Sequence, residues 1–156
     1  MSVLINKTYD EIQVDDSATF ERTLTEKELV LFAAVSGDVN PVHLDPEFAK
    51  TTMFGEQIAH GMWSGSLISA ALATVLPGPG TIYLGQELSF RLPVKLADTL
   101  TVTLTVKEKL SKNRVIMDTL VTNQDGKKVV VGTATVMAPT EKAELQAPVL
   151  PDITIG

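Results

Sequence analysis

The sequence predicts an α+β fold in which one long, buried helix is wrapped by an antiparallel sheet. Residues 61–76 are apolar or small on almost every side and stop at Pro77, so this helix must be covered all round. The second half of the chain changes to a period of two, which is typical of strands with one buried face. An Asp125-Gly126 turn signal joins the last two of these strands, and we therefore expect an antiparallel sheet.

The composition is that of a single soluble domain. The 156 residues are 44% hydrophobic, which is enough to form a real core. A net charge of −6 argues against a nucleic-acid partner, and the absence of cysteine excludes disulfides and thiol nucleophiles. The long helix falls short of the roughly twenty residues that span a bilayer. The first residues lack a signal-peptide pattern, so we expect a cytoplasmic protein with no membrane partner.

Local signals place the elements before the long helix. Residues 18–24 alternate as a short strand does. Thr25 and Glu28 match a capping box that begins a helix, and Gly37 stands where a left-handed residue would end it. A second short helix is expected after Asp45-Pro46, because Asp is a good N-cap and Pro suits the first helical position.

The segment Ser36–His43 is expected to be a shaped loop, neither helix nor strand. Its Gly, Asp, Asn and Pro residues are poor helix and strand formers. Pro41 fixes its own φ and biases Asn40 away from the helical region. The side chains of Asp38 and His43 can then point into one pocket.

Period-two alternation marks the strands of the second half, over residues 82–92, 99–106, 115–122 and 129–137. Thr99–Val106 alternates strictly, with its aliphatic residues on one face. Pro139 ends the sheet, and residues 139–156 show no periodicity, so we expect an irregular tail on a single domain of residues 1–156. A sheet of this kind wrapped around one buried helix is the hot-dog fold.

Three motifs carry a resemblance to a known family. They are Ser36-Gly37-Asp38-Val39-Asn40-Pro41-Val42-His43-Leu44-Asp45, then His60-Gly61-Met62, and the strand Ile82–Gln86 with Phe90 and Pro93. Together they resemble the MaoC-like hydratase-2 family over essentially the whole chain. The likeness is closest to the small (R)-specific enoyl-CoA hydratases of bacterial polyhydroxyalkanoate synthesis.

The resemblance implies that Asp38 and His43 are catalytic and hold one water, which adds syn to a trans-2-enoyl-CoA and gives an (R)-3-hydroxyacyl-CoA. Such an addition needs acid/base groups for one water and a donor for the thioester oxygen. Asn40 would orient the water or the histidine. Gly61, at the start of the long helix, would offer its unpaired N–H as the oxyanion donor. His60 is expected to be structural and to orient the loop before Gly61.

Further expectations concern the substrate and assembly. Trp63, Leu67, Ser69 and Leu72 on the long helix would line the acyl pocket, which favours short to medium chains. The basic side chains of Arg91, Lys95, Lys112 and Arg114 would hold the phosphates of coenzyme A, although a solvated strand connection explains them equally well. The resemblance implies a homodimer and no cofactor beyond the coenzyme A of the substrate.

Several other interpretations stay open. Asp38 and Asn40 taken alone are ordinary turn residues. A zinc site of Asp38, His43, Asp45 and His60 is conceivable, but the resemblance implies no metal. Ser64, Ser66 and Ser69 are possible nucleophiles without the Gly-x-Ser-x-Gly elbow. A hot-dog acyl-CoA thioesterase, an acyl-carrier-protein dehydratase or a non-catalytic acyl-binding subunit would use a similar pocket.

Overall fold

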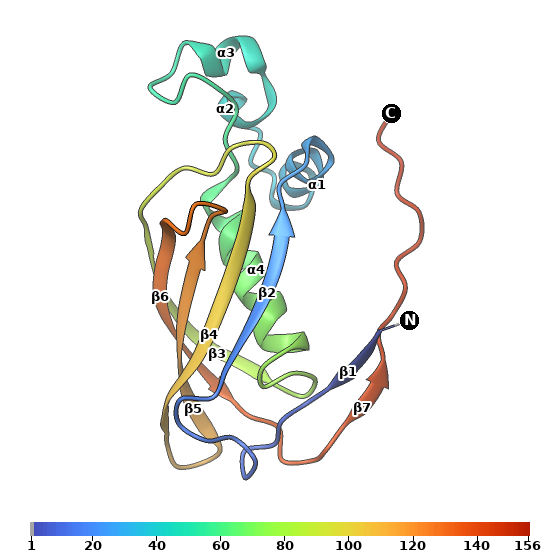
Figure 1. Cartoon of the computed structure of the whole chain (residues 1–156). Helices are drawn as coiled ribbons and strands as arrows, with labels where there is room; N and C mark the ends of the chain where they lie inside the picture. Colours follow the sequence, from blue (N-terminus) through green and yellow to red (C-terminus); the bar gives the residue numbers. More distant parts are fainter. Residues whose placement is uncertain (1) are drawn as a thin grey trace.

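A curved antiparallel sheet holds the long helix α4 (Gly61–Thr74) against its inner face in the computed structural model, which describes residues 2–156 (Figure 1). The strand order is β2-β4-β5-β6-β3, and all neighbours are antiparallel. The strands are β2 (Ser17–Thr23), β3 (Ile82–Phe90), β4 (Thr99–Lys109), β5 (Arg114–Thr122) and β6 (Lys128–Met137). This arrangement confirms the predicted antiparallel sheet around one helix.

The core lies between the sheet and α4. On β4 the aliphatic residues predicted for the inner face are fully buried, while the threonines between them are partly exposed. From α4, Ile68, Ala71 and Leu72 pack into the same cluster. The helix ends at Thr74, two residues before the predicted end at Leu76.

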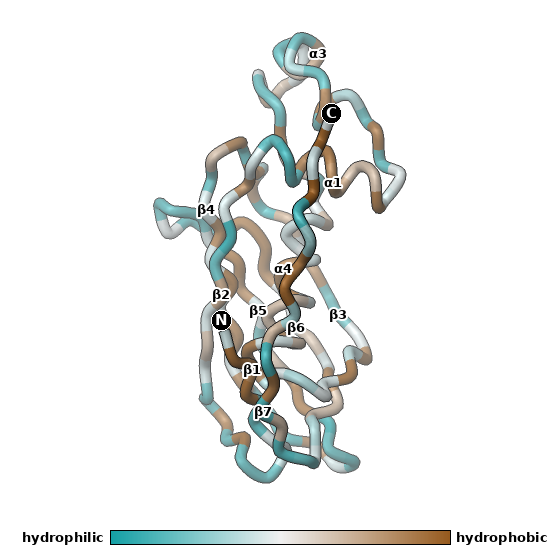
Figure 2. Tube along the Cα trace, turned by 90° about the vertical axis from the view of Figure 1, so that its right-hand side faces the viewer, coloured by the Kyte–Doolittle hydropathy of each residue, from teal (hydrophilic) through white to brown (hydrophobic). Residues whose placement is uncertain are grey.

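The prediction that the long helix is covered all round is wrong for a single chain. The sheet covers one side of α4, and Met62, Ser66, Ser69 and Ala73 are exposed on the other side. Figure 2 looks onto this open side, where the C-terminal tail passes in front of α4. None of the helices within residues 2–156 has the length and apolar character needed to cross a membrane.

Helix α1 (Glu26–Ser36) begins and ends at the predicted residues. The Thr25 hydroxyl accepts from the Glu28 N–H, the Glu28 carboxylate accepts from the Thr25 N–H, and Gly37 ends the helix with φ +79°. Helix α3 (Pro46–Lys50) is capped by Asp45, as expected.

The prediction of a loop from Ser36 to His43 is wrong in its second half. Residues Pro41–Leu44 form a single helical turn, α2. Asn40 caps this turn, because its side-chain oxygen accepts from the Val42 N–H at 3.3 Å. Pro41 occupies the first helical position, where its fixed φ is favourable and its missing N–H costs nothing. His43 therefore lies on a helix and Asp38 on the loop before it.

The prediction of an irregular tail over residues 139–156 is wrong for one short segment. β7 (Glu144–Gln146) pairs with β1 (Val3–Ile5) in a separate two-stranded sheet. Beside this pair the buried Asn6 side chain bonds the backbone of Pro79, Glu141 and Ala143. Beyond β7 the chain runs extended toward α1, where the Lys27 ammonium donates to the Ile153 carbonyl (Figures 1 and 2).

Candidate active site

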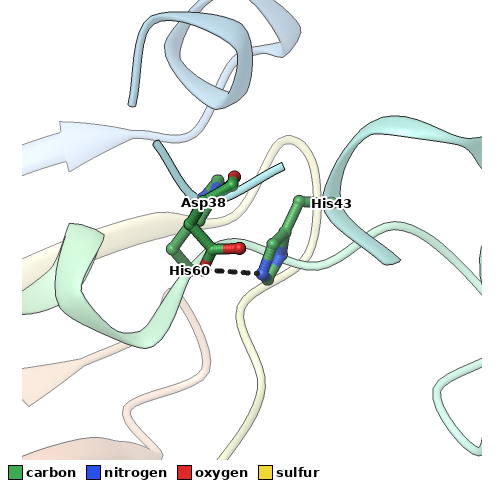
Figure 3. A group of neighbouring side chains, drawn as sticks. All are labelled: Asp38, His43 and His60. Atoms are coloured by element: carbon green, nitrogen blue, oxygen red, sulfur yellow. Dashed lines mark hydrogen bonds and ion pairs between the residues drawn. The ribbon is translucent and has the colours of Figure 1, made fainter. Parts of the chain in front are cut away.

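The end of α1 positions Asp38. The Ser36 hydroxyl donates to the Phe32 carbonyl at 2.6 Å and accepts from the Asp38 N–H at 3.1 Å. One oxygen of the Asp38 carboxylate accepts from the Asn40 N–H at 3.1 Å. The second oxygen, Oδ2, has no such local partner and faces His43 (Figure 3).

Helix α2 and the segment before α4 position His43. Its Nδ1 donates to the Ile58 carbonyl at 2.8 Å, and Gln57 Nε2 donates to the His43 carbonyl at 2.9 Å. A carbonyl can only accept, so the neutral ring carries its proton on Nδ1 and a lone pair on Nε2. His43 is buried, and its basic nitrogen is aimed at Asp38.

The two predicted catalytic groups lie together. His43 Nε2 is 3.8 Å from Asp38 Oδ2, and the Asp38 side chain is 49% exposed (Figure 3). This separation is long for a direct hydrogen bond, but a water at about 2.8 Å from each atom fits it. The arrangement can therefore hold one water between an acceptor nitrogen and a carboxylate.

His60 lies behind this pair. Its Nε2 donates to the Asp38 carbonyl at 2.9 Å, and its ring stacks on that of His43 with centroids 3.8 Å apart and planes at 24°. The Phe32 ring lies 5.0 Å from the same imidazole. His60 is also the N-cap residue of α4, so it links the catalytic pair to Gly61, the first residue of that helix.

A cavity of about 310 Å³ opens at the N-terminus of α4. The unpaired amides at a helix start carry partial positive charge, which suits a developing oxyanion. A Cβ on Gly61 would lie 3.1 Å from the Phe90 ring, so a larger residue would crowd this wall. The lining is mostly apolar and consists of Phe54, Ile58, Ala59, His60, Gly61, Ser64, Phe90, Arg91, Leu92, Pro93, Val94, Val129 and Val130.

The residues expected to line the acyl pocket are dispersed. Trp63 and Leu67 line a different groove, of about 350 Å³, between α4 and the α1–β2 side. Leu72 is buried in the core, and Ser69 is exposed on the open side of α4. None of these side chains lines the cavity at Gly61.

The four basic residues divide between the two ends of the sheet. Arg91 lines the cavity at Gly61, and Lys95 lies nearby, paired with Glu56 at 3.3 Å. Lys112 and Arg114 follow the far end of β4, a strand that spans roughly 35 Å. Within one chain they are not brought to the catalytic pair (Figure 1).

The residues of the conceivable zinc site come together only in part. Donor atoms of Asp38, His43 and His60 lie within 4.8 Å of one another, whereas Asp45 caps α3. Imidazole binds a metal in the plane of its ring, at about 2.0–2.1 Å. Because the two rings are stacked, an ion between their free nitrogens would lie out of the plane of at least one. The donor set fits a metal poorly.

Backbone and aromatic partners of the site went unrecognised in the sequence. The Ile58 carbonyl orients His43, and any residue type could supply it. Phe32 contacts His60, but an isolated aromatic carries no signal of that role. Phe90 was part of a motif, but its position beside Gly61 was not predicted. The motif residues were recognisable because their types are unusual together.

Comparison with known proteins places this site in a family. The sequence model of the MaoC like domain matches residues 11–137. An (R)-specific enoyl-CoA hydratase of Rhodospirillum rubrum is 42% identical over 136 residues, which cover 87% of this chain and 94% of that protein. A 3-hydroxyacyl-[acyl-carrier-protein] dehydratase of Solanum lycopersicum is 33% identical over 122 residues, with coverage of 76% and 73%.

Solved structures agree with the sequence matches. The unliganded R-hydratase PhaJ1 from Pseudomonas aeruginosa has a TM-score of 0.97 and 59% identity over 99% of this chain and 100% of that one. The (R)-hydratase from A. caviae involved in PHA biosynthesis has a TM-score of 0.80 and 42% identity, covering 82% of this chain and 98% of that one. These neighbours confirm the predicted hot-dog fold. With its sequence and its structure in agreement, the chain belongs to the MaoC-like domain family.

Proposed function

We propose that this protein is an (R)-specific enoyl-CoA hydratase, a hydro-lyase that adds water to trans-2-enoyl-CoA and supplies (R)-3-hydroxyacyl-CoA for polyhydroxyalkanoate synthesis. The observation that carries the proposal is the Asp38–His43 pair, 3.8 Å apart, beside the N-terminus of α4. The names of its similar relatives support the same activity.

The reaction follows from the positions of these groups. His43 Nε2 accepts one proton of the bound water as its oxygen bonds to C3, while Asp38 accepts a hydrogen bond from the same water. Electrons move from the C2–C3 double bond to the thioester oxygen, and the Gly61 N–H stabilises the enolate. The pair then returns the proton to C2 on the same face. The (R) configuration of the product is proposed from the names of the similar hydratases, and the proposal includes no metal or separate cofactor.

One assay tests this function. Purified protein with crotonyl-CoA should lose the conjugated enoyl absorbance and give only the (R)-3-hydroxy product. Release of free thiol would identify a thioesterase instead, and binding without consumption would identify a non-catalytic acyl-binding subunit. Faster turnover of an acyl-carrier-protein substrate would favour the dehydratase, a candidate that the Solanum relative keeps open.

The proposal includes a homodimer. β3 is an edge strand with exposed Ile82, Leu84 and Phe90, and α4 leaves Met62 exposed on its open side. Edge strands with apolar side chains are usually paired or covered. The other edge, β2, exposes mainly polar residues, so a second copy is expected to pair along β3. A cytoplasmic location belongs to the same proposal and is tested by fractionation of expressing cells.

A further inference from the structure

We infer that His60 is a positioning residue that holds Asp38 and His43 at their working distance and ties both to Gly61. The inference rests on the proposed hydration and concerns a side chain to which that mechanism gives no chemical step. His60 is only 3% exposed, and its free nitrogen, Nδ1, is buried.

The first observation is the tether to Asp38. Among residues 2–156, the other hydrogen bonds of Asp38 join residues two positions away, Ser36 and Asn40. These local bonds shape the turn but do not attach it to the rest of the molecule. The bond from His60 Nε2 to the Asp38 carbonyl, at 2.9 Å, crosses 22 positions and attaches the turn to α4.

The second observation is the stack on His43. The hydrogen bond to the Ile58 carbonyl fixes the position of Nδ1 of His43, but the ring can still rotate about that hydrogen bond. The His60 ring, 3.8 Å away and tilted by 24°, limits this rotation from one face and keeps Nε2 directed at Asp38. A displacement of about 1 Å in such a pair can cost roughly a hundredfold in rate.

The third observation concerns the hydrogen bonds of His60. Its Nε2 donates to the Asp38 carbonyl, and its Nδ1 is buried with no partner in the described chain. The contacts of the side chain are therefore one donor to Asp38 and a flat ring against His43, which are the contacts of a positioning residue.

Two substitutions separate these contributions. His60→Gln retains an N–H donor within reach of the Asp38 carbonyl, whereas His60→Phe retains the ring and loses the donor. With crotonyl-CoA we expect His60→Phe to lower kcat by about a hundredfold with little change in KM, and His60→Gln to recover most of the loss. Tyr9→Phe is the matched control: it also keeps a ring and loses a donor to a backbone carbonyl, that of Leu110 beyond the far end of β4, and it should stay near wild type.

A double-mutant measurement decides whether His60 acts through Asp38. In an Asp38→Asn background, His60→Phe should reduce turnover little further, because a group that positions Asp38 is redundant once Asp38 cannot exchange its proton. Losses that multiply would overturn the inference, as would wild-type kcat in His60→Phe.

Binding of butyryl-CoA, measured by calorimetry, shows whether His60→Phe is folded. If this variant fails to bind, His60→Gln alone decides: near-wild-type kcat supports the tether, and a hundredfold loss contradicts it. An inactive wild type would instead refute the proposed function.

Discussion

Asp38 lies on the loop after α1 and His43 on the short helix α2, and their side chains face each other without a direct hydrogen bond. If both act on one water, Asp38→Asn and His43→Ala should each lower turnover by several orders of magnitude. The double variant should lose little more than either single one, because groups that act as a unit are not additive. Steady-state hydration of crotonyl-CoA measures all three variants.

Affinity for coenzyme A esters separates this loss from unfolding. Asn at position 38 preserves the volume of the side chain and its hydrogen bond to the Asn40 N–H, so butyryl-CoA binding should change little. Near-wild-type hydration by either single variant would refute the mechanism. Losses that multiply in the double variant would indicate two independent roles.

At the scale of the residue, the sequence identified the candidate site residues that belong to a recognisable motif. Asp38, His43 and Gly61 were predicted from the motif, and they lie together at the start of α4. The contacts that orient them were not predictable, because the Ile58 carbonyl is a backbone group. The side-chain oxygen of Asn40 caps α2, and its amide nitrogen remains as a donor for a water.

At the scale of the element, Gly37 directs the chain from α1 into the Asp38 turn. Its φ of +79° lies in the left-handed region, and an added Cβ would meet no atom within 4 Å. Gly37→Ala should therefore destabilise the fold by about 1–2 kcal/mol through backbone strain alone, with a fall in kcat from the displaced turn. Urea unfolding and crotonyl-CoA turnover measure the two effects.

Asparagine tolerates the left-handed region better than other non-glycine residues. Gly37→Asn is therefore the control and should remain closer to wild type in stability and rate than Gly37→Ala. Equal effects of Ala and Asn would show that the left-handed conformation is not what positions Asp38.

Leu72 tests the central helix. It is 1% exposed among core residues, so Leu72→Ala should lower the free energy of unfolding by roughly 2–5 kcal/mol. Leu72 does not line the cavity at Gly61, but we propose that a longer acyl chain reaches it through the core beyond that cavity, in which case the smaller side chain should raise the eight-carbon rate relative to the four-carbon rate. Unchanged relative rates for the two substrates would remove Leu72 from the lining.

Elements with strong local signals were predictable, including the short helix α3 with its Asp45 cap, and short elements without such a signal were not. The capping box of α1 and the alternation of β4 are each encoded within one segment. β1 and β7 are three residues each, too short for a period, and depend on pairing between the chain ends. The helical turn α2 was not predicted, because Asn40-Pro41 is a loop signal. The same two residues also suit the N-cap and the first position of a helix.

At the scale of the whole molecule, Glu11 joins the two ends of the chain. Its carboxylate accepts from the Thr8 N–H and hydroxyl and pairs with Lys142 at 3.1 Å. The bond from the Thr8 backbone, followed by that from Lys142, lowers the pKa of Glu11 from 4.5 to about 2. The stabilisation is complete above pH 4.5 and is lost as the pH falls from 4.5 toward 2, because protonation breaks both links.

Amide exchange across the β1–β7 pair, corrected for intrinsic rates, should therefore accelerate through this pH window in the wild type. In Glu11→Gln the exchange should already be faster near neutral pH and should lose most of its dependence on pH in the same window. A wild type whose β1–β7 protection is constant down to pH 2 would show that Glu11 does not secure the chain ends.

The sequence predicted the fold of the whole molecule correctly, but it could not show which surfaces stay open. The hydrophobic pattern of α4 implies cover on all sides, yet it does not say whether that cover comes from the same chain. The structure shows that the sheet of one chain leaves Met62 and the β3 edge exposed. An experiment in solution tests whether a second copy of the chain covers these surfaces.

The homodimer is tested by placing a charge on the β3 edge. Leu84 is 48% exposed on this strand, and Leu84→Lys should convert the dimer to a monomer in sedimentation at micromolar concentration, since a buried, unpaired charge opposes pairing. Val14→Lys is the control, because Val14 is exposed to 52% but lies in the loop before β2. A wild-type monomer would contradict the dimer, and a dimer that survives Leu84→Lys would place the interface away from β3.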